Sequence, residues 1–572
     1  MILIVKASIF EQVVPHTQEN PQAFDLALTD WKHLLGSEHV VTSAEQIKSI
    51  ARTTFKTEQN VLGILYPKNT SEVIQCVKIA NQYEIALYPV STGNNFGLGN
   101  AVPCADNNVI IHLGKMNKIL EFDEEMGCIT VEPGVTQKQI SQFLNEKNSK
   151  FMFGVTGSAP ETSAIGNTAE RGDCASIEPE RANVVCNLSV VLPNGDYIET
   201  GFGAYKNAKT KQLSRWGLGP SYDGMFLQSN LGIITKATFW LTPKPKYIQY
   251  YVFVLKDATK LNAVVNRLRE LKQTKFIPNN VYMWNKYKLF SIFQRYPWDM
   301  TNETPLPDTI SEELSKKYHI GEWVGIIPLY ASSKLHAKAQ KKLIKAELRK
   351  HVDSLLLINK KTVKLFDYIA KPINKIFKID LAKITMLFKS GILTGNPAEA
   401  GLSSIYWRKK KVPEKLNNLL EDNCGLFWGA FAIPFKGDDA TKACEEISRI
   451  TLAHGFEPNL ALLGINERII TLAVALVYDR DLSDEDKKAE ACYFEVFDYM
   501  IKAGYIPNRI AINSFDKLPA TTFDYYDFNV RIKNSLDPKN ILAPNRYISA
   551  EKKYKATNSA VSVALEQRKI LK

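Results

Sequence analysis

A short glycine-rich segment, residues 91–100, constrains most strongly what this chain can fold into and bind. It reads Ser-Thr-Gly-Asn-Asn-Phe-Gly-Leu-Gly-Asn and directly follows an apolar run at 85–90, which predicts a buried strand. Glycines permit positive φ angles and close approach, so backbone N–H groups of such a loop can converge on one anion. No G-x-x-x-x-G-K-S/T motif occurs, and no G-x-G-x-x-G opens a helix after a first strand. The segment therefore predicts a pyrophosphate loop that is neither a P-loop nor a Rossmann turn.

The size and composition of the chain predict a globular protein with more than one structural unit. Its 572 residues exceed what one hydrophobic core usually supports. No apolar run approaches the roughly 20 residues that span a bilayer, and residues 1–6 are too short for a signal-peptide core. The eight cysteines are scattered without C-x-x-C or zinc-type spacing, which predicts reduced thiols and no metal site. We therefore predict a cytoplasmic protein.

The net charge of +12 is concentrated in two stretches of the second half. Residues 334–350 hold seven Lys or Arg against one Glu, and residues 358–389 hold eight lysines and two aspartates. The first stretch also places Leu335, Ala339, Leu343 and Ala346 at helical spacing. Both stretches are typical of surface helices with solvated basic faces, and peripheral contact of 334–389 with an anionic membrane or an acidic partner is the alternative. No recognised nucleic-acid-binding module accompanies the charge, so we expect no nucleic acid.

Short helices and strands alternate irregularly along the chain, which favours an α+β fold. The N-terminal half predicts strands at 61–67, 85–90, 109–113 and 128–131, a helix after the capping box of Asn69 and Glu72, and a helix over 136–146. Residues 183–200 predict a hairpin, with Asn194-Gly195 as a type I′ turn. The prolines of 242–246 predict a linker. Beyond it, helix patterns alternate with strands such as 250–254 and 470–475.

Motifs spread over residues 61–547 resemble, in order and spacing, the vanillyl-alcohol oxidase and 4-cresol dehydrogenase family of FAD flavoproteins. The matching segments are 91–99, Gly166-Asn167-Thr168-Ala169-Glu170-Arg171-Gly172, 216–226, 230–236, Tyr406-Trp407-Arg408 and 537–544. The resemblance implies an FAD-binding domain of two α+β subdomains, with an α+β cap domain that carries the substrate site. It places the FAD domain at 1–243, with 511–550 returning to it, the cap at 244–510, and a basic tail at 551–572.

The resemblance also implies which residues hold FAD. They are Pro89, Ser91, Thr92, Gly93, Asn94, Asn95, Phe96, Ser163, Gly166, Asn167, Gly172, Gly232, Ile233, Ile234, Arg509 and Arg546. Enzymes of this kind take a hydride from an activated carbon onto flavin N5. In the phenol-oxidising members, two tyrosines and an arginine hold a phenolate, an acid lies near N5, and a cap histidine or tyrosine links covalently to the flavin.

This sequence departs from the family pattern at most of those positions. The two phenolate-binding tyrosines correspond to Leu98 and Asn508, and a pocket histidine of the cap corresponds to Ile469. The covalent histidine falls at Gly425 or Leu426, so we expect FAD to be bound non-covalently. Two charge-assisted hydrogen bonds would contribute roughly 1.5–3 kcal/mol each, and leucine and asparagine cannot replace them. The loss argues against ordinary 4-alkylphenol oxidation.

The charged groups that survive predict the reactive end of the site. Glu180 corresponds to the acid near N5 and is the expected proton acceptor, although Glu178 and Arg181 are close enough in sequence to form a surface ion pair instead. Arg509 is expected to stabilise an anion, with three open readings: reduced flavin at N1 and O2, a substrate carboxylate, or a structural ion pair. Glu467 survives beside the lost cap histidine.

Tyr406, Tyr505 and Cys174 are the other candidates. Tyr406 and Tyr505 could replace a lost hydroxyl or could pack in the core, and Cys174 is a packed thiol or a flavin neighbour. We predict an FAD-dependent oxidase or dehydrogenase that acts on an alcohol, an amine or a carboxylate-bearing secondary metabolite and reduces O₂ or a redox protein. The alternatives are 4-alkylphenol or aryl-alcohol oxidation with a re-sited group such as Tyr406, and a non-catalytic flavin-binding scaffold. A homo-oligomer, such as a dimer, is expected.

Overall fold

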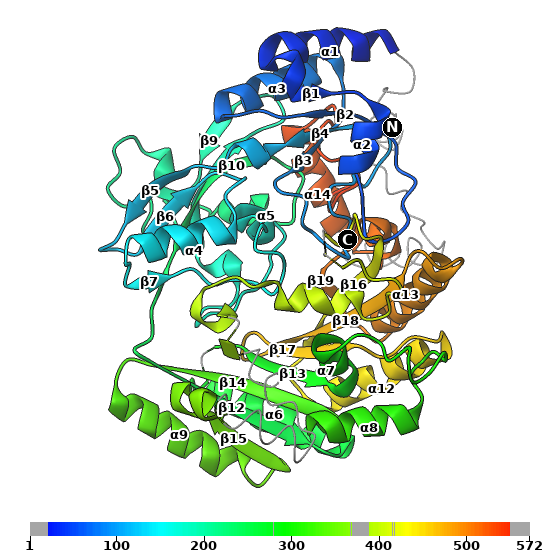
Figure 1. The fold of residues 1–572 in the computed structure, drawn as a ribbon. Coiled ribbons are helices and arrows are strands. Elements are labelled where there is room, and N and C mark those ends of the chain that lie inside the picture. The colour runs from blue at the N-terminus through cyan, green and yellow to red at the C-terminus, as the bar shows by residue number, and fades with distance from the viewer. Residues whose placement is uncertain are drawn as a thin grey trace, which may run out of the picture.

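The computed structural model describes residues 21–549, except 278, 367, 369–387, 390, 415 and 417. Figure 1 shows two parts: the N-terminal half with two small sheets, and a second half built on one large sheet. The strands β16, β18 and β19 lie where the two parts meet (Figure 1). None of the helices in this described part is long and apolar enough to cross a membrane. The expected basic tail at 551–572 lies outside the described residues.

The first sheet has the order β1-β2-β4-β3, with β2 and β3 both parallel to β4. Its strands are β1 (Val40–Val41), β2 (Val61–Leu65), β3 (Leu87–Val90) and β4 (Asn108–His112). The helices beside it are α1 (Pro21–Leu35), α2 (Ala44–Ile50) and α3 (Thr70–Tyr83), and α1 and α3 share a core around the fully buried Trp31. The predicted start of α3 is confirmed, because the Asn69 side chain accepts a hydrogen bond from Glu72 N.

The second sheet is antiparallel, in the order β5-β6-β10-β8-β9. Its strands are β5 (Ile119–Asp123), β6 (Cys128–Val131), β8 (Val185–Val191), β9 (Tyr197–Glu199) and β10 (Ile233–Trp240). Its helices are α4 (Gln137–Glu146) and α5 (Ala164–Ala169). A two-stranded ribbon, β7 (Phe151–Met152) with β11 (Thr242–Pro243), ends this part, so the predicted linker begins as a short strand.

The turn between β8 and β9 differs from the prediction. Only Gly195 has a positive φ, of 84°, whereas a type I′ turn needs two such residues. Gly195 N donates a hydrogen bond to Leu192 O at 2.8 Å, which closes a turn with Pro193 and Asn194 in the middle. Proline fixes φ near −65° and therefore favours the ordinary type I turn followed by a left-handed glycine. The type I′ assignment was wrong because it ignored Pro193.

The large sheet has the order β15-β12-β14-β13-β17-β18-β16-β19, and all neighbouring strands are antiparallel. Its strands are β12 (Tyr247–Leu255), β13 (Val281–Asn285), β14 (Trp323–Ala331), β15 (Ser354–Ile358), β16 (Cys424–Pro434), β17 (Leu460–Gly464), β18 (Ile469–Asp479) and β19 (Pro507–Arg509). The helices packed around it are α6 (Leu261–Gln273), α7 (Lys286–Phe293), α8 (Asp308–Tyr318), α9 (Lys334–Leu348), α12 (Gly437–Ala453) and α13 (Glu485–Lys502). The side chains of β16 and β18 alternate between a core shared with α6, α12 and α13 and the opposite face.

The chain after residue 510 returns to the first sheet. Helix α14 (Phe523–Leu536) packs its Ile532 and Leu536 against the core of the second sheet, and the segment after it reaches β3. Leu87 N donates to Ile541 O at 2.7 Å, and Ala543 N donates to Leu87 O at 2.8 Å. This pairing is what a returning C-terminal segment requires, and we keep 243/244 and 510/511 as the proposed domain boundaries.

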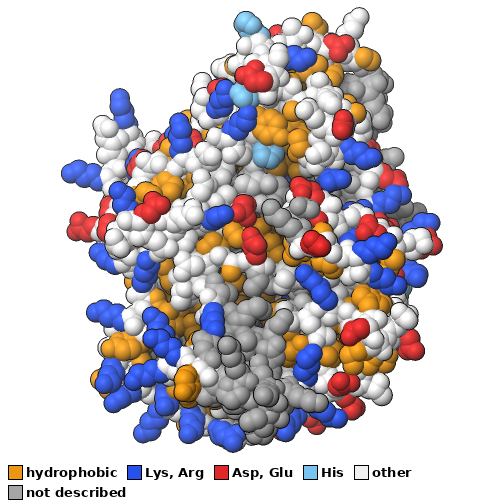
Figure 2. Space-filling view, in the orientation of Figure 1, with side chains coloured by type: hydrophobic (Ala, Val, Ile, Leu, Met, Phe, Trp, Pro, Cys, Tyr) orange, Lys and Arg blue, Asp and Glu red, His pale blue; other side chains and the backbone are white. Residues whose placement is uncertain are grey.

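The basic helix α9 is oriented differently from the pattern seen in the sequence. Its buried residues are Ala337, Gln340, Ile344 and Leu348, whereas Leu335 is 78% exposed and Leu343 37% exposed. Packing of α9 against β12 and β14 fixes this phase, and periodicity alone could not. Figure 2 shows Lys and Arg side chains gathered at the lower left, where α9 lies in Figure 1. Most of the second basic stretch, 358–389, lies outside the described residues.

Candidate functional site

A cavity of about 930 Å³ lies between the two small sheets and the inner face of the large sheet. This volume is at the upper end of what ligand pockets occupy. Strand alternation explains its cap wall, since every second residue of β16 and β18 points into it. Those residues are Leu426, Trp428, Ala430, Ala432, Ile469, Thr471, Ala473, Ala475 and Val477. The remaining walls come from the glycine-rich loop, from segments around residues 155–175 and 226–234, and from 542–546.

The glycine-rich loop presents unpaired backbone donors to this cavity. The backbone N–H groups of residues 92–96 donate no hydrogen bond to any described residue. Gly93 has a φ of 71° and Gly97 a φ of 76°, values that favour glycine. Asn100 Nδ2 donates to Gly93 O at 2.9 Å and holds the turn closed. Converging free amides form an anion-binding nest, as a pyrophosphate requires.

All sixteen residues that the resemblance assigned to FAD line this one cavity. Two of its glycines permit close approach, because a Cβ at Gly166 would lie 2.2 Å from Ser91 Oγ and one at Gly172 would lie 2.3 Å from Asn167 Nδ2. Asn167 Oδ1 is buried without a hydrogen-bond partner in the described chain. Buried polar atoms are rarely left unpaired, so a polar ligand is expected there. The residues present therefore fit an FAD molecule.

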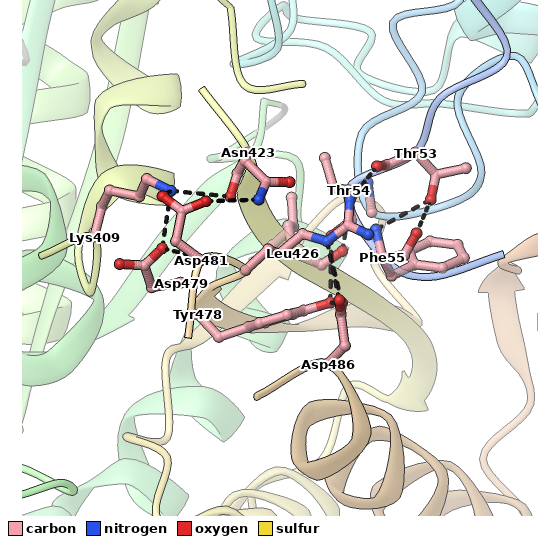
Figure 3. Close-up of polar contacts among 12 residues, drawn as sticks. Thr53, Thr54, Phe55, Lys409, Asn423, Leu426, Tyr478, Asp479, Asp481 and Asp486 are labelled. Atoms are coloured by element: carbon pink, nitrogen blue, oxygen red, sulfur yellow. Dashed lines mark hydrogen bonds and ion pairs between the residues drawn. The ribbon is translucent and has the colours of Figure 1, made fainter. Parts of the chain in front are cut away.

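Residues 53–55 tie the glycine-rich loop to the cap strand β16 (Figure 3). Thr54 Oγ1 accepts a hydrogen bond from Gly97 N at 3.0 Å and donates one to Leu426 O at 2.8 Å. Leu426 N in turn donates to Thr54 O at 2.9 Å. Arg480, which follows β18, donates to Thr53 O at 2.9 Å. The three contacts of Thr54 fix position 426 against the phosphate loop, which the sequence did not reveal.

Arg509 and Asn508 come from β19 and reach the same end of the cavity as the loop. Arg509 Nη2 donates to Asn95 Oδ1 at 2.8 Å, and its Nε is buried without a partner among the described residues. Asn508 Nδ2 donates to Thr471 Oγ1 at 3.0 Å, while its Oδ1 is also unpaired. Two unpaired polar atoms at this end indicate that a polar ligand completes it.

Two carboxyl groups face each other across a short antiparallel bridge in the cavity wall. Glu180 accepts hydrogen bonds from Asn466 Nδ2 at 2.8 Å and from Asn183 Nδ2 at 2.9 Å. The side chain of its bridge partner Asp173 has a hydrogen bond with its own backbone N–H and none with another described residue. Burial raises the pKa of the Asp173 carboxyl, and the cation Arg509 partly offsets this. Asp173 was not predicted, although it directly follows the quoted motif ending at Gly172.

Tyr406 and Glu467 are not brought to the cavity. Tyr406 donates its hydroxyl proton to Asp422 at 2.6 Å and is buried behind the wall. Glu467 pairs with Lys275 at the surface. Both positions follow from packing outside the cavity, so we assign neither a direct role.

Of the other residues named from the sequence, some line the cavity and some do not. Tyr505 donates to Asp439 at 2.6 Å, away from the cavity. Leu98, the counterpart of a lost tyrosine, does line the cavity and is almost fully buried. Cys174 lines it as well, and burial raises the pKa of its thiol to about 11. The phenol that reaches the cavity from the cap is Tyr282, which the sequence did not single out.

A family model described as an FAD binding domain matches residues 61–201. The chain is 37% identical over 529 residues to 1'-carboxy-chondrochloren decarboxylase of Chondromyces crocatus, which covers 92% of this chain and 98% of that relative. It is 29% identical over 535 residues to the 4-cresol dehydrogenase [hydroxylating] flavoprotein subunit of Pseudomonas putida, and the match covers 91% of this chain and 95% of that relative. The crystal structure of p-cresol methylhydroxylase with substrate bound matches with a TM-score of 0.82 and 26% identity, over 93% of this chain and 98% of that one.

These matches extend over both halves of the chain, and the cavity joins the loop, the cap strands and the returning C-terminal segment. They confirm the predicted fold class, an α+β FAD-binding domain of two subdomains with an α+β cap. They also confirm FAD as the cofactor and enzymatic activity. The chain therefore belongs to the vanillyl-alcohol oxidase and 4-cresol dehydrogenase family of FAD-dependent oxidoreductases.

Proposed function

We propose that this enzyme oxidises a carboxylate-bearing organic substrate by removing a hydride from an activated carbon. The supporting observation is the end of the cavity where Asp173, Glu180 and Arg509 meet while Leu98 and Asn508 stand in place of a phenolate-binding tyrosine pair. An arginine and two carboxyls suit a substrate that carries an anion and also loses a proton. The 37% identical relative from Chondromyces crocatus is named as the decarboxylase of a carboxy compound, which favours a carboxylic acid over a neutral alcohol or amine.

The side chains at this end of the cavity have different proposed roles. FAD, when bound, supplies the two-electron acceptor for the hydride. Asp173 is the proposed acceptor for a proton from a substrate O–H or N–H, since its side chain lines the cavity without a hydrogen bond to another described residue and burial raises its pKa, which makes the carboxylate a stronger base. Glu180, held in place by Asn183 and Asn466, is the second proton acceptor. Arg509 stabilises negative charge beside Asn95.

The remaining properties of the holoenzyme are also proposals. No histidine lines the described cavity, which supports non-covalent FAD, and acid precipitation of the holoenzyme is expected to release the flavin. The electron acceptor is O₂ or a redox protein; the Pseudomonas putida relative is named as a flavoprotein subunit, which supports a partner chain. The exposed lysines of α9 offer a basic surface for an acidic partner. A cytoplasmic location and a homo-oligomer stay predictions.

Anaerobic bleaching of the flavin by a substrate panel tests the proposed class. The panel contains 3-arylpropionic acids, aryl alcohols, benzylamines and 4-alkylphenols at equal concentration. We expect the carboxylic acids to bleach the flavin fastest, and Asp173→Asn to slow that bleaching by roughly 10²–10⁴-fold, as loss of a general base does. Fastest bleaching by 4-alkylphenols would contradict the proposal and favour phenol oxidation. A flavin that no compound bleaches and no acceptor reoxidises would favour the non-catalytic scaffold.

A further inference from the structure

Lys288 is a cation in the wall of the cavity that no charged group of the described residues neutralises. It lies in the first turn of α7, where Asn285 caps the helix by accepting a hydrogen bond from Lys288 N at 3.0 Å. Among the described residues its ammonium group makes one polar contact, a long one of 3.4 Å to Ser404 Oγ. Lys288 forms no ion pair with a described carboxylate. The cap domain thus places one unpaired positive charge in the wall of the site.

The environment of this charge is deep and apolar. Burial lowers the pKa of the Lys288 ammonium to about 8, and no neighbouring charge contributes to that shift. Lys288 is only partly buried in the protein and lines the cavity. A buried cation without a counter-charge costs free energy that an incoming anion recovers. At neutral pH the ammonium is still largely charged and available to such an anion.

The surroundings of Lys288 restrict the kind of anion. Its Nζ lies 6.0 Å from the centroid of the Trp428 ring, and Trp428 packs on an apolar cluster that includes Leu426, Ala475 and Val477. These residues all line the cavity. The Lys288 ammonium is the available donor here, because the Ser404 hydroxyl accepts the long contact from Lys288 and donates its own proton to Gly401 O at 2.7 Å. A single charged donor matches a singly charged carboxylate, whereas a phosphate dianion usually takes more donors. The apolar cluster suits a hydrophobic body attached to that carboxylate.

We propose that Lys288 binds the carboxylate of the substrate from the cap side of the cavity, with the apolar part of the substrate lying along Trp428. This inference rests on the proposed function, since it names the group that recognises the carboxylic acid. Lys288 then determines specificity, and Asp173 and Glu180 remain free for proton transfer. The nearby Lys286 has no such role, because it pairs with Glu322 at 2.9 Å outside the cavity.

Binding of a model anion to the oxidised holoenzyme tests the inference without turnover. The probe is 3-phenylpropionate, the neutral control ligand is 3-phenylpropionamide, and the readout is the change in flavin absorbance on titration. We expect Lys288→Met to weaken 3-phenylpropionate about 10- to 150-fold, which corresponds to the loss of one charge-assisted hydrogen bond. Binding of the amide should change less than threefold. Lys288→Arg should retain most of the affinity, and Lys286→Met, the matched control on the same helix, should retain all of it.

The pH profile gives a second readout that a structural role would not produce. Affinity of the wild type for 3-phenylpropionate should fall as pH rises through about 8, and this fall should disappear in Lys288→Met. Equal weakening of acid and amide, or unchanged affinity for the acid, would overturn the inference. So would loss of FAD or an altered flavin spectrum of unliganded Lys288→Met, because the lysine would then serve the cofactor. Failure of every carboxylic acid to bleach the flavin, with the binding results as expected, would reject the proposed function and leave the carboxylate site standing.

Discussion

Two buried lysines of this protein have opposite surroundings, and the difference separates a structural site from a ligand site. Lys533, in the returning helix α14, is fully buried and pairs with Asp537 at 2.6 Å. It also donates to Asn230 O at 2.8 Å and to Leu542 O at 2.9 Å. Lys288 has one long contact to a hydroxyl and opens onto a cavity. A closed set of partners stabilises the fold, whereas an incomplete set leaves a place for a substrate.

The physical reason lies in how each site obtains its partners. Lys533 and Asp537 are four residues apart on one chain segment, so folding of that segment brings the charges together. The Asp537 carboxylate also accepts from Ile541 N and Leu542 N, which completes the cluster. Lys288 lines the cavity, and no described carboxylate pairs with it. Among the described residues its counter-charge is missing, which leaves that place for a ligand.

The largest loss of stability is expected from replacing Lys533, which has a complete set of partners. Lys533→Met leaves the Asp537 carboxylate buried without its cation and should lower the free energy of unfolding by about 3–5 kcal/mol. Urea unfolding followed by far-ultraviolet circular dichroism measures this loss. The control is Lys539→Met, whose partner Glu84 is at the surface at 3.3 Å, and it should cost less than about 1 kcal/mol. Equal effects of the two substitutions would remove the distinction drawn above.

Replacement of Lys288, whose site opens onto the cavity, should instead raise the free energy of unfolding. The pKa of Lys288 is about 8 in the folded protein and 10.5 without burial, so the unfolded chain binds more protons between these pH values. Stability of the wild type should therefore rise with pH in this window, while below pH 8 the cost of the buried charge is constant. Lys288→Met should be more stable than the wild type by about 3 kcal/mol at pH 7, with the difference lost near pH 10.5.

Parallel urea titrations of the two proteins at pH 7, 9 and 10.5 measure this difference. Lys272 has a similarly lowered pKa and is present in both proteins, so its contribution cancels. Saturating 3-phenylpropionate should narrow the gap at pH 7 by stabilising only the wild type. A Lys288→Met protein that is less stable than the wild type at every pH would show that Lys288, like Lys533, stabilises the fold.

The smallest effect is expected at Thr54, a polar group with all its partners at the border of the cavity. Thr54→Val removes the hydroxyl and leaves Gly97 N and Leu426 O without it, which should cost about 1–2 kcal/mol of stability. Because Thr54 holds the phosphate loop against β16, FAD should also dissociate more readily. Fluorescence of released FAD on dilution measures the second effect. Thr53→Val, which leaves the loop contact intact, is the matched control; equal FAD release from both variants would contradict the assigned link.

Much of the local structure could be predicted because its determinants lie within a few residues. The caps at Asn69 and Thr136 and the apolar runs of β2, β3 and β6 give local patterns that no distant contact overrides. The turn-forming character of the glycine-rich loop was equally predictable, since Gly93 and Gly97 adopt the positive φ that favours glycine. The prediction of a type I′ turn was wrong for an equally local reason, because it neglected Pro193.

Glu180 and Arg509 were expected from their motif positions and do line the cavity, but Asp173 and Lys288 could not be predicted in the same way. These two residues come from segments more than a hundred residues apart, and only packing brings them to one cavity. Tyr406 and Glu467 were chosen from family positions, but the phase of their segments turns them toward Asp422 and Lys275. Motif order says which residues are near the site, not which of them point into it.

The sequence by itself determined the FAD-binding family, the position of the glycine-rich loop and the approximate bounds of several strands and helices of the N-terminal half, because these depend on short-range backbone preferences and on ordered motifs. The tertiary structure alone decided which charged side chains have partners and which do not. That distinction depends on the side chains of β16 and β18, which point alternately toward and away from the cavity, and on the packing of the cap against the loop. Burial of Lys288 without a described counter-charge costs free energy, which a bound anion would recover.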